Sequence, residues 1–203
     1  MLTTLPETIL WRRLDRPGHE SCQLSRTTLG WLLEGLAVFG HEQQPCALSY
    51  SIRCTASWET KSAVVRGWVG NNVIDVDVNV VDQGSWLLNG KGQPDLTGCL
   101  DIDLNFSPST NTLPIRRLNL EIGEERDVQA AWLRFPGFTL ELLKQRYRRL
   151  DRNTYHYESA DGTFVRVLPV SEAGLVTHYP GFWLAENAHH GGNDAMPQSS
   201  GAS

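Results

Sequence analysis

Two short stretches of the sequence concentrate arginines that could hold an anion. Arg116 and Arg117 follow a proline-capped turn, at the start of a short helix predicted within residues 109–120. Arg146 and Arg148 lie two positions apart, so in a strand they would share one face. Guanidinium groups form bidentate hydrogen bonds with phosphate, sulfate or carboxylate. The simpler interpretation is that these side chains are solvated or form salt bridges with the aspartates at positions 75, 77, 101 and 103.

Aromatic side chains supply a second set of candidates. The chain has seven tryptophans, a residue type that lines apolar grooves and stacks on sugars while its N–H finds a polar partner. The residues that we select as further ligand contacts are Trp68, Trp132, Tyr155, Tyr157, His178 and Tyr179. For any single one of them, packing in the core is the plainer interpretation. Trp58 is the tryptophan that we expect in the core.

Two acidic rows raise the alternative of metal-dependent chemistry. Asp75 and Asp77 lie on one predicted strand, Asp101 and Asp103 on another, and neighbouring strands with paired carboxylates could hold Mg²⁺. A hydrated strand face is the simpler interpretation. A calcium loop is excluded, because Phe106 stands where that loop requires glycine. The sequence also lacks zinc-like spacing, a phosphate-binding glycine loop and a nucleophile elbow. We therefore assign no catalytic residue, no metal and no cofactor.

The dominant pattern of the chain is period-two alternation. It predicts strands over residues 46–58, 73–82 and 100–106, each with one apolar and one polar face. One dry and one wet face is typical of antiparallel sheets, whereas parallel strands are apolar on both faces. Residues 139–150 could form a strand or a helix, and we favour a strand because Pro136 and Gly137 precede them.

The count of predicted strands defines the fold class. About ten or more strands in one chain must curl, close or split into two packed layers. We predict a mainly β fold, in which a large, strongly curved antiparallel sheet forms an open half-barrel or a two-layer sandwich, with at most one or two short helices. Residues 1–186 are expected to form a single domain, and the small polar residues 187–203 a disordered tail.

Charge and cysteine content limit the partners and the compartment. The net charge of −5 is not that of a nucleic-acid-binding protein. The N-terminus has no signal-peptide pattern, and no apolar run is long enough for a membrane helix. The four cysteines form no paired motif. If residues 46–58 are one strand, Cys46 and Cys54 stand about 26 Å apart, too far for a disulfide. We expect a soluble, cytoplasmic protein.

Several segments resemble the bacterial family named "putative glycolipid-binding". They are Trp11–Cys22, Leu88–Gly90, Gly98–Asp101, Asn111–Arg117, Gln145–Arg149 and Leu175–Gly181. The resemblance spans residues 9–184 or so. It implies long, curved antiparallel strands and a shape similar to the periplasmic lipoprotein carriers, which shelter acyl chains in a concave apolar face.

A binding function is therefore favoured over an enzymatic one. The leading hypothesis is non-covalent binding of an amphipathic ligand, a lipid or glycolipid, on a concave face lined by aromatic residues. The arginines and tyrosines selected above would contact its polar part. One alternative is a metal-dependent hydrolase acting on a phosphorylated or acyl substrate. Another is a protein-interaction module whose core is filled by its own side chains.

Overall fold

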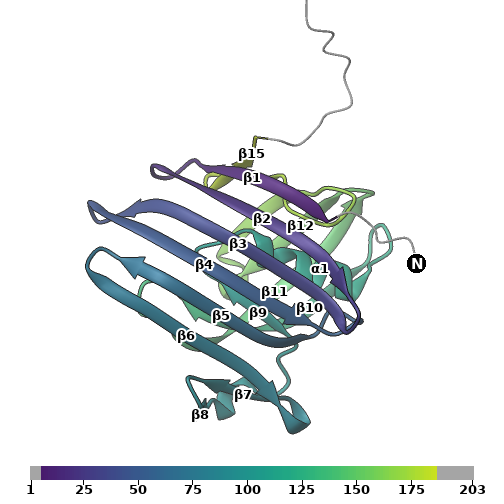
Figure 1. The fold of residues 1–203 in the computed structure, drawn as a ribbon. Coiled ribbons are helices and arrows are strands. Elements are labelled where there is room, and N and C mark those ends of the chain that lie inside the picture. Colours follow the sequence, from purple (N-terminus) through teal and green to yellow (C-terminus); the bar gives the residue numbers. More distant parts are fainter. Residues whose placement is uncertain (1–5, 187–203) are drawn as a thin grey trace, which may run out of the picture.

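Long hairpins build one large antiparallel sheet from the first half of the chain. The computed structural model describes residues 6–186, so the predicted tail at 187–203 lies outside the described residues. The strands of this sheet are β1 (Glu7–Arg13), β2 (Gly18–Thr27), β3 (Gly30–His41), β4 (Gln44–Cys54), β5 (Thr60–Val69), β6 (Asn72–Val81), β7 (Ser85–Leu88) and β8 (Lys91–Gly92). Two short C-terminal strands, β14 (His178–Tyr179) and β15 (Trp183–Ala185), extend it beyond β1. The order is β14-β15-β1-β2-β3-β4-β5-β6-β7-β8 (Figure 1).

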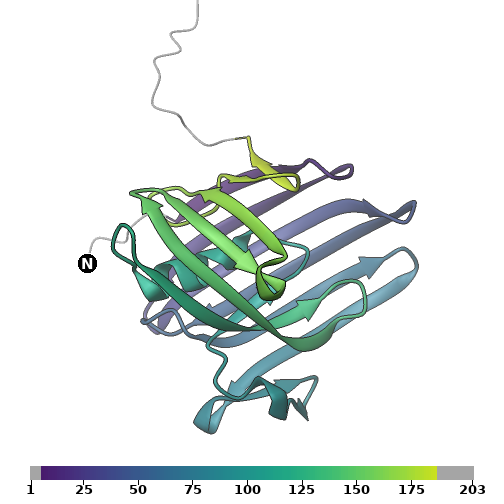
Figure 2. The same cartoon turned by 180° about the vertical axis from the view of Figure 1, so that it is seen from behind.

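A smaller sheet covers one face of the large one (Figure 2). Its strands are β9 (Asp101–Leu104), β10 (Glu125–Arg134), β11 (Thr139–Asp151), β12 (Thr154–Ser159) and β13 (Phe164–Pro169), in the order β13-β12-β11-β10-β9. All pairs are antiparallel except β9 with β10. A parallel pair needs a long crossover connection. The crossover here carries helix α1 (Thr112–Leu118).

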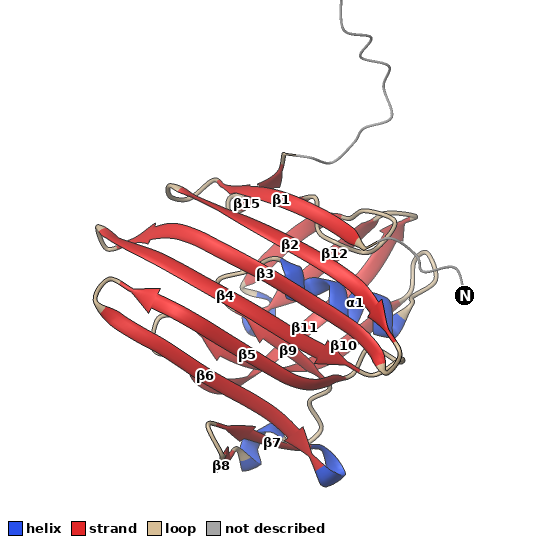
Figure 3. Ribbon diagram, viewed as in Figure 1, coloured by secondary structure: helices blue, strands red, loops and turns tan. Residues whose placement is uncertain are grey.

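Helix is scarce: Figure 3 shows α1 behind the large sheet and short helical turns beside β7 and β8. Besides α1, the described residues contain four single turns of 3₁₀-helix, namely Asp82–Gly84, Pro94–Leu96, Ser109–Asn111 and Ala160–Gly162. The prediction of a mainly antiparallel β fold with very little helix is confirmed, and the large sheet is not closed into a barrel. The ambiguous residues 139–150 lie in strand β11, as favoured.

The core fills the space between the two inner faces. Trp11, Leu48 and Ile52 of the large sheet are buried in one apolar cluster with Leu104 and Leu133 of the small sheet. Alternation along each strand turns these side chains inward and leaves polar neighbours outside. A second, smaller cluster lies between α1 and the small sheet and is rich in tyrosine.

Strand β9 is joined to both sheets. It pairs with β10 in the small sheet. On its other side, the Thr60 N–H of β5 donates to the Leu100 carbonyl at 2.9 Å, and the Ile102 N–H donates to Thr60 Oγ1 at 3.0 Å. This short strand therefore fixes where the small sheet sits over the large one.

The predicted strand over residues 46–58 is too long. Strand β4 ends at Cys54, and Trp58 adopts a φ of 72°, in the left-handed region that ends extended structure. Trp58 is nevertheless buried, as expected, because its ring stacks on Trp31 with centroids 4.2 Å apart. All four cysteines are free and buried, as the prediction of no disulfide requires.

The two acidic rows are not neighbours, and the prediction of hydrated faces fails for one of them. Asp75 and Asp77 lie on β6 and pair with Arg66. Asp101 lies on β9, in the other sheet, and is buried against Arg117 with a shortest N···O distance of 2.6 Å. Within residues 6–186, no three acidic, histidine or cysteine side chains are grouped as metal ligands. The same residues include no helix that could span a membrane.

The missing side chain of a glycine makes room for a buried tyrosine of the core. Gly35 of β3 stands opposite Tyr50 of β4, and the tyrosine ring lies over the glycine. A Cβ atom at position 35 would come within 2.3 Å of the Tyr50 hydroxyl oxygen. That hydroxyl donates a 2.7 Å hydrogen bond to Glu20, so the glycine sets the position of a buried network.

We expect Gly35→Ala to lower the free energy of unfolding by about 1–3 kcal/mol, because the new methyl group overpacks the core and displaces Tyr50. Gly92→Ala is the matched control, since Gly92 also lies in a strand but has open space around its α-carbon. Urea denaturation of both variants measures the difference. Equal stability of the two variants would contradict the steric role of Gly35.

Candidate functional site

A cavity of about 390 Å³ lies between the small sheet and the β1–β15–β14 end of the large one. Its apolar wall is mostly aromatic and is contributed by residues far apart in the sequence. The rings and aliphatic side chains that line it are those of Leu104, Phe106, Trp132, Phe135, Leu143, Tyr157, Phe164, Tyr179, Phe182 and Trp183. Neighbouring rings meet edge to face, as Tyr179 and Phe182 do at 5.7 Å between centroids.

An arginine between two aromatic rings forms part of the polar wall. The Arg13 guanidinium lies 4.7 Å from the Phe39 ring centroid and 4.5 Å from that of Trp183. It also donates two hydrogen bonds, of 2.9 and 3.0 Å, to the Asp15 carboxylate. Burial acts to raise the pKa of Asp15, but the bonds and charges of Arg13 and Arg16 prevail and lower it. The wall therefore presents a charged, rigid pair.

Asp103 contributes a second carboxyl group to the cavity. Its Oδ2 accepts a 2.6 Å hydrogen bond from Gln145, whose amide also donates to the Tyr157 hydroxyl at 3.1 Å. No lysine, arginine or histidine of residues 6–186 forms an ion pair with it. Burial raises the pKa of Asp103 to about 6, and the bond from Gln145 opposes the rise only in part. This carboxyl group is therefore free to accept hydrogen bonds from a ligand.

Glu20 lies behind the cavity wall and is almost fully buried. Its Oε1 accepts hydrogen bonds from Tyr50 at 2.7 Å and from Ser107 at 2.5 Å, and Ser107 lines the cavity. Its Oε2 has no hydrogen-bond partner among the described residues. Burial raises the pKa of Glu20 to about 7, although the two hydroxyl bonds and the Arg13 charge act to lower it. A buried carboxyl group that is unsatisfied on one side holds its proton near neutral pH.

The raised pKa of Glu20 predicts a pH-dependent stability. The folded protein retains a proton that the unfolded chain releases near pH 4.5, so this contribution to stability is complete below pH 4.5 and is lost as the pH rises to about 7. The loss is on the order of 3 kcal/mol. We expect Glu20→Gln to flatten the fall in the free energy of unfolding between pH 4.5 and 7, measured by urea denaturation.

Burial also raises the pKa of Asp103, from its usual 3.8 to about 6. Asp103 therefore also makes the folded protein less stable as the pH rises through that range. The matched control is therefore Asp103→Asn, which should flatten only the acidic part of the curve. A Glu20→Gln curve parallel to that of the wild-type protein would show that Glu20 titrates at an ordinary pKa in the folded state.

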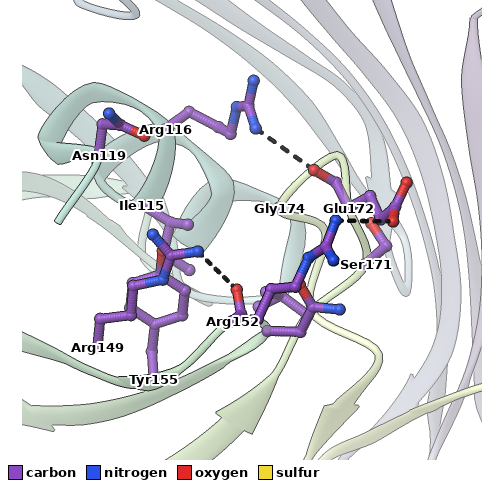
Figure 4. Close-up of a pocket in the computed structure, with 11 residues that line it drawn as sticks. Ile115, Arg116, Asn119, Arg149, Arg152, Tyr155, Ser171, Glu172 and Gly174 are labelled. Carbon is purple, nitrogen blue, oxygen red and sulfur yellow. Dashed lines mark hydrogen bonds and ion pairs between the residues drawn. The ribbon is translucent and has the colours of Figure 1, made fainter. Parts of the chain in front are cut away.

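A second, smaller depression of about 220 Å³ lies beside the C-terminal end of α1; we call it the arginine hollow (Figure 4). Its charged lining consists of Arg116, Arg149, Arg152 and Glu172, with Tyr155 at its base. Arg149 donates to the carbonyl oxygens of Leu120, Asp151 and Arg152 at 2.8, 3.1 and 2.7 Å. Its guanidinium is 5.9 Å from the Tyr155 ring centroid. The hollow is polar and has positive charge in excess.

The structure places five of the ten predicted ligand contacts in these two cavities. Trp132, Tyr157 and Tyr179 line the aromatic cavity. Arg116 and Tyr155 line the arginine hollow.

The remaining predicted contacts lie in neither place. Arg117 is committed to the buried Asp101, and Arg146 pairs with Asp127 at 2.7 Å on the exposed face of the small sheet. Arg148, next on that face, is also exposed, and Trp68 is 49% exposed on the outer face of the large sheet. His178 is partly buried in β14.

Sequence reasoning missed the polar wall of the cavity. Arg13, Asp15 and Glu20 lie in the segment that carries the family resemblance, but a polar residue in an alternating strand usually faces solvent. For Glu20 a signal existed, because it occupies the same alternation as Cys22 and Leu24, which point inward. Ser107 and Phe135 lie in loops, where periodicity gives no information.

The fold and the cavity together are those of a two-sheet, mainly antiparallel β protein with a partly open cavity lined by aromatic rings. The chain belongs to the family described as "Putative glycolipid-binding", whose model matches residues 8–185. No curated protein matches the chain.

Two solved structures are similar to it. A DUF1089 family protein from Pseudomonas aeruginosa is 30% identical, with a TM-score of 0.67, covering 91% of this chain and 95% of that one. A β-barrel-like protein of a domain of unknown function from Brucella abortus is 9% identical, with a TM-score of 0.54 and coverages of 91% and 96%, and shows likeness of fold alone.

Proposed function

We propose that this protein binds an amphipathic ligand, a lipid or glycolipid, in the aromatic cavity between its sheets, without catalysing a reaction on it. The observation that carries the proposal is the wall of that cavity, where rings from both sheets surround a space of about 390 Å³. Small-molecule sites are commonly 300–1,000 Å³, mostly apolar, with a few polar groups that orient the ligand. The family description supports the same class of ligand.

The apolar part of the ligand supplies the binding energy in this proposal. Each methylene group transferred from water to an apolar site contributes about 0.8 kcal/mol. Rings such as Trp132 and Phe164 are only partly buried by the protein itself, so a ligand would cover apolar surface that the folded chain leaves accessible. A core that filled itself completely would leave no such surface.

The polar part of the ligand meets a wall that carries both signs of charge. Arg13 and Arg16 are paired with Asp15, while Gln145 is the one hydrogen-bond donor to the Asp103 side chain among the described residues. A carboxylate accepts hydrogen bonds from hydroxyl groups and repels an anion. We infer that the headgroup in this cavity is uncharged and hydroxylated, as a glycosyl or polyol group is.

The cytoplasm is the compartment that we propose for this binding. The four cysteines are unpaired and buried, which suits a reducing environment. A role there would be to sequester or carry a hydrophobic intermediate.

Native mass spectrometry of freshly purified protein tests the proposal most directly, with the organic extract of the same sample analysed beside it. We expect a discrete added mass on the 22.7 kDa chain that matches an amphiphile in the extract. A chain that is bare after mild purification, and that takes up no amphiphile when mixed with the lipids of its host, would refute the proposal.

A defined probe locates the site. We expect octyl β-D-glucoside, below its micellar concentration, to bind the wild-type protein and to bind Trp132→Ala about tenfold more weakly, because the indole is part of the cavity wall. Trp68→Ala is the matched control, since this indole is 49% exposed on the outer face of the large sheet. Isothermal titration calorimetry measures both. An equal loss in the two variants would place the site elsewhere.

A further inference from the structure

The arginine hollow brings together more positive charge than the protein itself neutralises. Three guanidinium groups line it, against the single carboxylate of Glu172. That carboxylate is 3.7 Å from Arg152, and both side chains are more than 80% exposed. An exposed pair at this distance contributes little to stability and is easily exchanged for another partner.

Arg149 is the fixed element of the hollow. Three of its five N–H donors are held by backbone carbonyl oxygens, so two remain for a ligand. No carboxylate of the described residues forms an ion pair with it. The same three bonds cover the carbonyl oxygens of Leu120, Asp151 and Arg152, which would otherwise repel an anion. The guanidinium is therefore held in place before any ligand arrives.

Arg116 approaches from α1; its stem is held, and no carboxylate among residues 6–186 forms an ion pair with it. Its Cδ and Cγ lie against Gly174, where a Cβ atom would meet them at 2.9 and 3.2 Å, and Gly174 itself has a φ of +89°. Its guanidinium makes a long 3.4 Å bond to the Glu172 carbonyl oxygen and lies 5.4 Å from the Trp58 ring centroid. Arg116 and Arg152 both extend toward Glu172, over the same opening (Figure 4).

The field of these arginines reaches the base of the hollow. Burial raises the pKa of the Tyr155 hydroxyl, and the charges of Arg149 and Arg116 oppose that rise. A negative charge in the hollow would therefore face two guanidinium groups at close range. The polar lining offers no apolar surface for an acyl chain comparable to that of the aromatic cavity.

We propose that the arginine hollow is a second binding site, separate from the aromatic cavity, for a tetrahedral oxyanion such as a phosphate or a phosphomonoester group. Arg149 and Arg116 bind its oxygens, Arg152 closes over it, and Glu172 is the group that it displaces. The site does not depend on the proposed function, because no lining residue is shared by the two cavities.

Titration of the full-length protein with inorganic phosphate at low ionic strength tests the site. We expect saturable binding of one phosphate per chain, weakened about tenfold in Arg116→Gln and tightened in Glu172→Gln, which removes the competing carboxylate. Arg146→Gln is the matched control, because Arg146 is also an exposed arginine, paired with Asp127, and lies outside the hollow. Its affinity for phosphate should equal that of the wild-type protein.

Further measurements separate the possible sources of the oxyanion and the two sites. Vesicles of phosphatidylcholine with one fifth phosphatidic acid should sediment with the wild-type protein, and not with Arg116→Gln, if the group is a lipid headgroup. Binding of free phosphate alone indicates a soluble ligand. Arg116→Gln should bind octyl glucoside normally, and Trp132→Ala should bind phosphate normally. Absence of saturable phosphate binding, or equal weakening in Arg116→Gln and Arg146→Gln, would overturn the proposal.

Discussion

The hydrogen bonding of β9 to both sheets is the constraint on which the rest of the structure depends. Thr60 of the large sheet uses its backbone N–H and its hydroxyl to bind residues 100 and 102, while β9 pairs in parallel with β10 of the small sheet. Backbone N–H and C=O groups buried between two layers need hydrogen-bond partners. These bonds therefore hold β9 in place relative to both sheets. Asp101 and Asp103, two residues apart on β9, then meet different partners: Arg117 binds Asp101, and Asp103 lines the aromatic cavity.

The buried polar groups around β9 form a connected network. Asn111 binds Tyr147, and Gln145 joins Asp103 to Tyr157, so the inner face of the small sheet is tied to the 3₁₀ turn that precedes α1. A satisfied network of this kind fixes one arrangement of side chains, whereas apolar packing alone tolerates several. The walls of the cavity are therefore held in place before a ligand enters. Glu20, with one unsatisfied oxygen, is the exception among the described residues.

Both candidate sites include residues from one face of the small sheet. Tyr155 and Tyr157 are two residues apart on β12, so both point inward and their α-carbons are separated by about 7 Å. Tyr157 reaches the aromatic cavity and Tyr155 the arginine hollow, with Tyr147 buried beside them. A single extended site across arginines and tyrosines was the natural interpretation of the sequence. The sheet divides it, because the buried tyrosines fill the space between.

The sequence by itself determined the β class, the scarcity of helix, most of the strands and the free cysteines, because period-two alternation and turn residues are local signals. Only the tertiary structure decided which groups the charged residues of the chain pair with. Asp101 reads as solvent-facing and is buried, since the crossover through α1 brings Arg117 to it. Arg13 and Glu20 likewise read as ordinary strand residues until the small sheet covers them. Alternation indicates on which face of a strand a side chain lies, but not which residues pack against that face. The chemistry of both candidate sites depends on those opposing residues.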